Sequence, residues 1–254
     1  MSPPVQVLPV GGLPELEPGA RVGELVVTAI RSGGDELRAD DVLVVSQKAV
    51  SKAEGRIVDL AEVEPTERAR ELALRLDKDP RLVETILREA RDVVRAERGV
   101  LITRTRAGLV CANAGVDGSN VPGEDRVTLL PEDPDASARR LREEVRSASG
   151  AAPAIVIADS FGRPWRLGQA EVAIGCAGLV ALDEWRGRHD RQGQTLAATA
   201  IAVADHVAAA ADLVRSKDDG VPACVVRGLG RFVTVEDGPG AAALRRPEDE
   251  DLFR

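Results

Sequence analysis

The sequence contains no tyrosine, and its 254 residues include only three phenylalanines and two tryptophans. Proteins that bind single-stranded nucleic acid stack its bases on several aromatic side chains, so this composition argues against that class. Lysine and arginine are outnumbered by aspartate and glutamate, 34 to 42, which gives a net charge of −8. A chain this acidic is not expected to bind nucleic-acid backbones. An anionic substrate would therefore need a local cationic site or a metal ion.

Long apolar runs and cysteines are also scarce. No apolar run reaches the roughly 18 residues that a membrane-spanning helix needs, and the first residues lack the basic and apolar regions of a signal peptide. Cys111, Cys176 and Cys224 are odd in number and widely spaced. This is more typical of buried thiols in a reducing compartment than of a disulfide framework. We therefore expect a cytoplasmic protein with no membrane contact.

The familiar nucleotide-binding motifs are absent. A Walker A loop places Gly-Lys before Ser or Thr, and none of the four lysines follows a glycine. A Rossmann-like glycine pattern starts at Gly238, but only eleven residues follow its last position, Ala243. A βαβ unit does not fit in that length, so any nucleotide site must be of another kind.

Strands alternate irregularly with helices, which predicts an α/β protein with a mixed sheet and some α+β character. Apolar runs predict strands at residues 5–10, 42–46, 126–131, 154–159 and 222–230, with another beginning in 169–182. Apolar residues at helical spacing predict helices at 21–32, 134–148 and 194–215, and two more with Pro65 and Pro80 in their first turns.

Two further features complete the expected organisation. Residues 100–105 and 109–113 flank a short glycine-bearing turn and predict a hairpin. The apolar face of the helix after Pro80 continues to Val94.

Residues 1–235 are expected to form one domain. Residues 236–254 are charged and rich in proline and glycine, and we expect a mobile tail there.

A polar segment at residues 113–120 has no role in a predicted core. Its two glycines allow the backbone to approach a ligand closely. Asp117 offers the hard anionic oxygen that Mg²⁺ or Mn²⁺ prefers, and the amide of Asn120 can hold a base or a ribose. The alternative is an Asx-rich turn without a ligand.

Another polar segment follows the predicted strand 154–159. Asp159 lies at its carboxyl end, a common ligand position in α/β proteins, and Ser160 adds a neutral oxygen. Arg163 and Arg166 are permanent cations that can clamp a carboxylate or a phosphate. An ordinary loop with solvated arginines is the alternative.

Lys48 and Lys52 lie just after the predicted strand 42–46. Lysines in such a place can act as point charges toward phosphates, although a solvated polar loop would look the same. Two aspartates, lysines and arginines together indicate a site for a nucleotide and a divalent metal. The residues alone do not identify the substrate.

Several strings in this order resemble the coenzyme F-420 gamma-glutamyl ligase family. They are LPVGGLPEL, VSKAEGR, NAGVDGSN, LLPEDPDASA, ADSFGRPWRLGQAEVAIGCAG, ADHVAAAADLV and VPACVVRGLG. The resemblance extends from about residue 5 to residue 233. It implies a family-specific α/β ligase fold and an intertwined homodimer. It also implies GTP-dependent ligation of L-glutamate to coenzyme F-420-0, followed by a gamma-linked addition, with Mg²⁺ or Mn²⁺ and K⁺.

The resemblance also assigns roles to individual residues. It implies that Asp117, Asp159 and Ser160 bind metal. It implies nucleotide contacts at Leu13, Pro14, Glu15, Leu16, Gln47, Lys48, Lys52 and Asn120. Some relatives have Met-Gly-Glu after the long helix, where this chain has Arg-Ser-Lys, so a carboxylate is missing and Lys217 could hold phosphate instead.

Alternatives to this activity stay open at this point. The motifs define a metal and nucleotide site better than they define the acceptor. A ligase or kinase acting on another carboxylate would therefore fit them. So would a non-catalytic metal-nucleotide-binding partner of a separate reductase, since the reductase-like domain of many relatives does not follow within these 254 residues.

Overall fold

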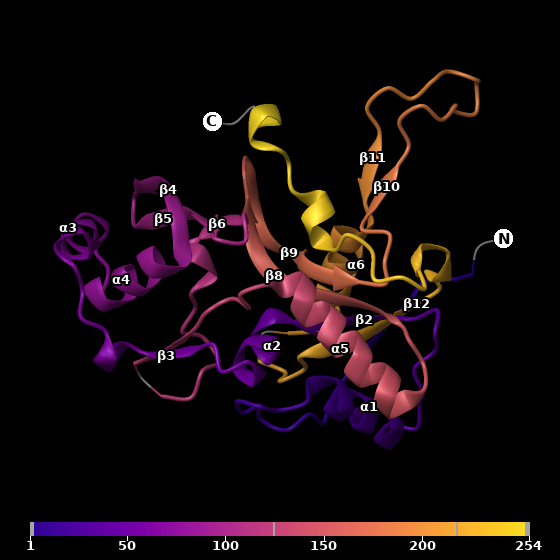
Figure 1. The fold of residues 1–254 in the computed structure, drawn as a ribbon, viewed down its shortest axis with the longest axis horizontal. Helices are drawn as coiled ribbons and strands as arrows, with labels where there is room; N and C mark the ends of the chain where they lie inside the picture. The colour runs from indigo at the N-terminus through magenta and orange to yellow at the C-terminus, as the bar shows by residue number, and fades with distance from the viewer. Residues whose placement is uncertain (1–2, 124, 217, 252–254) are drawn as a thin grey trace.

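A five-stranded mixed sheet forms the centre of the molecule (Figure 1). The computed structural model describes residues 3–123, 125–216 and 218–251. In spatial order the strands are β1 (Gln6–Val10), β12 (Ala223–Arg227), β2 (Val42–Ser46), β8 (Ala154–Arg163) and β9 (Arg166–Ala177). Only β2 and β8 pair in parallel in this sheet, and its other neighbours are antiparallel. The predicted α/β class with a mixed sheet is confirmed.

Helices cover both faces of this sheet. Successive side chains of a strand point to opposite faces, so Leu43 and Val45 belong to one apolar core and Val42 and Val44 to the other. The first core is closed by α1 (Val22–Ser32), α2 (Gln47–Ala53) and α5 (Pro134–Ser149), and the second by α6 (Val203–Asp212). Continuous apolar strands such as β2 are typical of a sheet covered on both sides.

A smaller unit lies beside the main sheet (Figure 1). It contains α3 (Glu67–Leu76), α4 (Pro80–Glu89) and the sheet β4 (Ala90–Glu97), β5 (Val100–Thr105) and β6 (Val110–Ala112) around a third core. The ladder of β3 (Ile57–Asp59) with β7 (Arg126–Thr128) belongs to the connection with the main body. The predicted hairpin is confirmed as β5 and β6.

The pair of helices in this unit differs from the prediction. The second helix ends at Glu89, because the residues that follow pair with β5 as strand β4. Ala90 and Val94 therefore do not belong to a helical face. Pro65 precedes the N-cap Thr66, whose hydroxyl accepts a hydrogen bond from the Ala69 amide, so it does not occupy the first helical position. Pro80 does.

The long helix predicted at residues 194–215 is also wrong in extent. Ala200–Ala202 forms strand β11 and pairs with β10 (Leu182–Glu184), and α6 begins only at Val203 and ends at Asp212. Alanine is a strong helix former, but tertiary strand pairing overrides that propensity here. The β10–β11 hairpin projects from the body of the molecule (Figure 1).

Short 3₁₀ helices occupy several connections: Leu60–Glu62, Asn113–Gly115, Gly230–Phe232, Ala241–Leu244 and Glu248–Glu250. The last two lie in the predicted tail. Ala241 is buried, and its amide donates to the Asp135 carboxylate at 2.7 Å. Glu248 pairs with Arg104 of β5. The segment thus contacts both the main body and the smaller unit, while its predicted mobility stays a prediction.

The three cysteines are free and buried. Burial raises the pKa of Cys111 and Cys176 to about 12 and that of Cys224 to about 11. The prediction of buried thiols is confirmed, and these thiols are protonated at neutral pH. No helix among the described residues is long and apolar enough to cross a bilayer.

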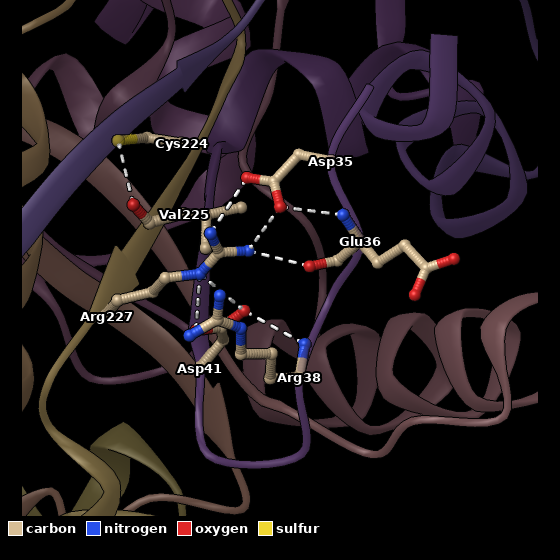
Figure 2. A network of polar contacts seen from close by, with 7 residues as sticks. All are labelled: Asp35, Glu36, Arg38, Asp41, Cys224, Val225 and Arg227. Atoms are coloured by element: carbon tan, nitrogen blue, oxygen red, sulfur yellow. Dashed lines mark hydrogen bonds and ion pairs between the residues drawn. The ribbon is translucent and has the colours of Figure 1, made fainter. Parts of the chain in front are cut away.

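A network of ion pairs fastens one end of the main sheet (Figure 2). Arg227 ends β12, and its Nε lies 3.1 Å from Asp41 Oδ1, just before β2. Its Nη1 lies 2.8 Å from Asp35 Oδ2, and its Nη2 donates to the carbonyl of Glu36 at 2.6 Å. The hydrogen bonds from Arg227 help hold the pKa of Asp35 below its ordinary value. One guanidinium therefore joins β12, the start of β2 and the loop after α1.

Replacing Arg227 with methionine should lower the free energy of unfolding by about 3–5 kcal/mol, because it leaves the Asp41 carboxylate buried without its cation. Asp41 is 1% exposed. Urea denaturation at neutral pH measures the change. Arg38→Met is the matched control, since it removes the same charge from an exposed neighbour and should change stability by less than about 0.5 kcal/mol. Equal losses in both variants would contradict a structural role for the network.

Candidate functional site

A cavity of about 820 Å³ opens at the other end of the sheet, where β2 ends and β8 leaves the buried core. Because these strands are parallel, with Ser46 opposite Ala158, the last residue of β2 lies beside the point where β8 continues into Asp159 and Ser160. This is the common ligand position in α/β proteins. The amide of Ser46 donates to the Pro222 carbonyl at 2.8 Å, which brings the start of β12 to the same edge.

Most of the site residues predicted from the sequence line this cavity. They are Leu13, Pro14, Glu15, Leu16, Gln47, Lys48, Lys52, Asp117, Asn120, Asp159 and Ser160. Lys217 lies outside the described residues. Arg163 and Arg166 are not among the lining residues: they are exposed and face each other across the β8–β9 turn, and Arg163 donates to the Leu167 carbonyl at 3.0 Å. Folding thus gathers polar groups from four separate segments into one place.

A tight turn places Asp117 at the cavity. Asn113, Ala114 and Gly115 all have positive φ, of 54°, 54° and 72°. This conformation is costly for residues with a side chain. At Gly115 a Cβ atom would lie 2.5 Å from Leu130 Cγ, so only glycine fits. Of the two glycines expected to bend this loop, Gly115 does so, and strain of this kind is often found at functional sites.

The Asp117 carboxylate is held by three hydrogen-bond donors. Its Oδ1 accepts from the Ser119 amide at 2.8 Å, while its Oδ2 accepts from Ser119 Oγ at 2.9 Å and lies 2.7 Å from Lys48 Nζ. The contact with the Ser119 amide forms an Asx turn. The turn that the sequence analysis offered as an alternative for this segment is therefore present. Burial raises the pKa of Asp117, but the hydrogen bonds from Lys48 and Ser119 lower it by more. The net effect is a pKa below the ordinary value of an aspartate. The carboxylate is therefore ionised at neutral pH.

Both cavity lysines lie one turn apart on α2, and each contacts a carboxylate. Lys48 bonds to Asp117, and Lys52 bonds to Glu15. Residues four apart share one face of a helix, which aims both ammonium groups into the cavity. Gln47 is 2% exposed and accepts from Ser51 Oγ at 2.9 Å, which anchors the helix beneath them.

Asp159 and Ser160 lie on β8 where this strand leaves the buried core. They pair in register with Val172 and Glu171 of β9. Burial is the main cause that raises the pKa of the Cys111 thiol on β6, and the negative charge of Asp159 also raises it. Asp159 therefore lies close to the strand that leads into the Asp117 loop, and both aspartates line the same cavity.

An ion pair in the cavity wall was missed by the sequence analysis. Arg215 Nη2 bonds to Glu171, and Arg215 Nη1 donates to the Pro222 carbonyl at 3.3 Å. Their side chains are 5% and 10% exposed, and Arg215 Nε has no hydrogen-bond partner. The one signal of this pair in the sequence was Glu171, a carboxylate within the apolar run of β9. Arg215, rather than Arg163 or Arg166, is the arginine that the cavity presents.

The charge balance of the cavity determines what it can bind. Among its described lining residues, six are acidic (Glu15, Asp117, Asp159, Glu171, Asp212 and Asp218) and three are basic (Lys48, Lys52 and Arg215). A phosphate-bearing ligand would be repelled here unless cations entered with it. A bound divalent ion is the usual solution to this problem.

The donor set fits a metal ion that is shared with a ligand. The described residues contain no group of three or more His, Cys, Asp or Glu that could hold a metal by itself. Mg²⁺ commonly takes one or two carboxylates, with waters and substrate phosphates as its remaining ligands. Asp117, Asp159 and Ser160 provide oxygen donors of this kind at one cavity.

The fold and the cavity define an α/β protein that gathers acidic and basic side chains in one cavity at the edge of its central sheet. A family model described as F420-0:Gamma-glutamyl ligase matches residues 12–228. The chain therefore belongs to the F420-0:gamma-glutamyl ligase family, and the resemblance seen in the sequence is confirmed.

Curated relatives extend the similarity to nearly the whole chain. A protein of Methanothermobacter thermautotrophicus is 41% identical over 98% of this chain and 99% of its own length. One of Methanopyrus kandleri is 43% identical over 99% and 98%, and one of Haloarcula marismortui is 42% identical over 98% and 96%. Each of these relatives is named Coenzyme F420:L-glutamate ligase.

Breaking the Arg215–Glu171 pair should destabilise the cavity wall. Arg215→Met leaves the Glu171 carboxylate buried without this guanidinium, and the free energy of unfolding should fall by about 3–5 kcal/mol. The Arg215→Met/Glu171→Gln double variant should recover part of this loss, measured by urea denaturation in a double-mutant cycle. Strictly additive effects of the two single variants would show that the side chains do not act as a pair.

Proposed function

We propose that the protein is a GTP-dependent ligase of coenzyme F420 biosynthesis. It joins L-glutamate to a carboxylate of coenzyme F420-0, releases GDP and phosphate, and then adds glutamate through a gamma linkage. Family membership and the names of the relatives support the ligase activity and its two organic substrates. The observation that carries the proposal is the single cavity that brings together Asp117, Asp159, Lys48 and Lys52.

The nucleotide is proposed to lie between the N-terminal segment and α2. Residues 13–16 and Gln47 line the cavity, and so does Asn120, which lies on the Asp117 loop. Lys48 and Lys52 offer two ammonium groups on one helix face, which suits successive phosphates. The choice of GTP rests on the resemblance of the sequence to this family.

Asp117, Asp159 and Ser160 are proposed to hold Mg²⁺ or Mn²⁺. Such an ion would neutralise phosphate charge and polarise the phosphoryl group that is transferred. The ionised state of Asp117 supports this role, because metal binding requires a deprotonated ligand. The requirement for K⁺ and the cytoplasmic location are further parts of the proposal, carried by the resemblance and by the free thiols.

The proposed reaction has two steps. A carboxylate oxygen of F420-0 attacks the γ-phosphorus of GTP, the bond from that phosphorus to the β,γ-bridging oxygen breaks, and GDP leaves. The glutamate amine then attacks the acyl carbon, phosphate leaves, and the amine loses a proton to form the amide. Phosphorylation supplies the leaving group that a carboxylate lacks. Lys52 would stabilise the phosphates by charge, and positioning should account for much of the rate.

A substrate carboxylate also needs a cationic partner. Sequence analysis suggested Arg163 and Arg166, which lie on the β8–β9 turn outside the cavity lining. We propose Arg215 instead, because it is the arginine among the described residues that line the cavity. A guanidinium is well matched to a carboxylate in charge and geometry.

A homodimer is proposed as the assembled form. At the β8–β9 turn Trp165 is 80% exposed and Leu167 is 98% exposed. Apolar surface of this kind is often covered by a partner. Light scattering should give twice the chain mass of 26.9 kDa, and Trp165→Ser/Leu167→Ser should shift the mass toward that of one chain. A monomeric parent protein would refute this part of the proposal.

The ligase proposal is tested by product analysis. With F420-0, GTP, glutamate and Mn²⁺, mass spectrometry should detect glutamylated F420, with one GDP released for each glutamate joined. Asp117→Asn and Asp159→Asn should each reduce the rate by about 100-fold or more, because transition-state charge is no longer neutralised. Circular dichroism should show an unchanged fold.

Asp249→Asn is the control, since Asp249 is exposed and outside the cavity lining. It should keep the parent rate. Continued GDP release without an amide product, in the complete mixture with glutamate present, would indicate a kinase. Near-normal ligation by both cavity variants would reject the metal assignment.

A further inference from the structure

Three oxygen atoms of one loop surround the ammonium group of Lys48. Its Nζ lies 2.7 Å from Asp117 Oδ2 and 2.7 Å from the Ser119 carbonyl oxygen, and it also bonds to Ser119 Oγ. A carboxylate, a carbonyl and a hydroxyl are also the oxygen donors that hard divalent cations take in proteins. The cation at this carboxylate is thus a side chain of the protein itself.

The pair is placed where the cation can be exchanged. Lys48 is 20% exposed and Asp117 is 48% exposed, so both reach the cavity without any unfolding. The helix below them is fixed by buried Gln47. Because a lysine carries its charge on a flexible four-carbon chain, the ammonium can leave Asp117 and turn toward the cavity while the backbone stays in place.

We propose that Lys48 is a placeholder cation that couples metal binding to nucleotide binding. A divalent ion that binds Asp117 must displace the ammonium, which then becomes available to a nucleotide phosphate. A nucleotide arriving alone must instead draw Lys48 away and leave the carboxylate facing a phosphate. Each ligand therefore binds better when the other is present, and by thermodynamic linkage the two enhancements are equal. This inference rests on the proposed metal and nucleotide sites.

Lys52 provides an internal comparison for this mechanism. It lies on the same helix, lines the same cavity and also contacts a carboxylate, but its partner is Glu15 rather than a proposed metal ligand. Removing either ammonium group makes the cavity more negative by one charge. A more negative cavity should attract any cation more strongly. Only the removal of Lys48 also uncovers a metal ligand, so the difference between the two variants isolates the displacement.

The test measures Mn²⁺ binding by electron paramagnetic resonance, with and without GDP, and needs no turnover. The parent protein should bind Mn²⁺ weakly alone and more tightly with GDP. Lys48→Met should tighten binding in the absence of GDP by about 5-fold or more beyond Lys52→Met, a factor at the lower end of allosteric couplings. The enhancement by GDP should shrink in the same variant. Lys78 is not among the residues that line the cavity, so Lys78→Met should behave like the parent.

Three results would overturn the inference, and the first differs in meaning from the other two. If Lys48→Met binds Mn²⁺ no more tightly than Lys52→Met while the parent binds Mn²⁺ with GDP, Lys48 does not compete with the metal and the proposed function stands. If the parent binds no Mn²⁺ even with GDP, or Asp117→Asn binds it equally well, the metal assignment fails and the inference fails with it. Thermal unfolding monitored by circular dichroism confirms that each variant is folded.

Discussion

The parallel pairing of β2 with β8 is the constraint on which the site depends. It aligns Ser46 with Ala158, so that α2 and its lysines leave the sheet at the same edge where Asp159 emerges. The antiparallel neighbours complete this edge, because β12 begins there and β9 returns with Glu171. Asp117 arrives from a different part of the chain, on a turn that Gly115 allows. No single segment contains the site: the register of β2 with β8 aligns α2 and Asp159, and the turn at Gly115 adds Asp117.

That assembly places more carboxylates than cations around the cavity, and this imbalance sets its chemistry. A protein that only had to bind phosphate would do better with arginines alone. Here Asp117 and Asp159 make the cavity a poor anion site by itself, and in the proposed function shared cations offset their charge. The same excess of carboxylates explains the contacts of Lys48 and Lys52. These two lysines of α2 neutralise two of the carboxylates in the cavity.

The sequence picked out side chains that the fold brings to one cavity, whereas it misplaced the boundaries of some elements. Asp117 and Asp159 stood out because polar groups there interrupt patterns that otherwise build a core, and both line the cavity. The Arg215–Glu171 pair joins residues 44 positions apart, a contact that no local pattern encodes. Strand β11 was missed for a related reason: its alanines favour a helix, and only pairing with β10 makes them a strand.

The two ends of the main sheet show how the same chemistry serves stability and function. At one end Arg227 has every nitrogen bonded, and its partner Asp41 is 1% exposed, so nothing can replace either group without a large loss. At the other end Lys48 and Asp117 bond as closely, but Asp117 is 48% exposed to a cavity. A buried pair is costly to break, whereas a half-exposed pair gains little from its contact and can give it up. Exposure, rather than distance, therefore separates the buried Arg227–Asp41 ion pair from the Lys48–Asp117 pair that we propose exchanges partners.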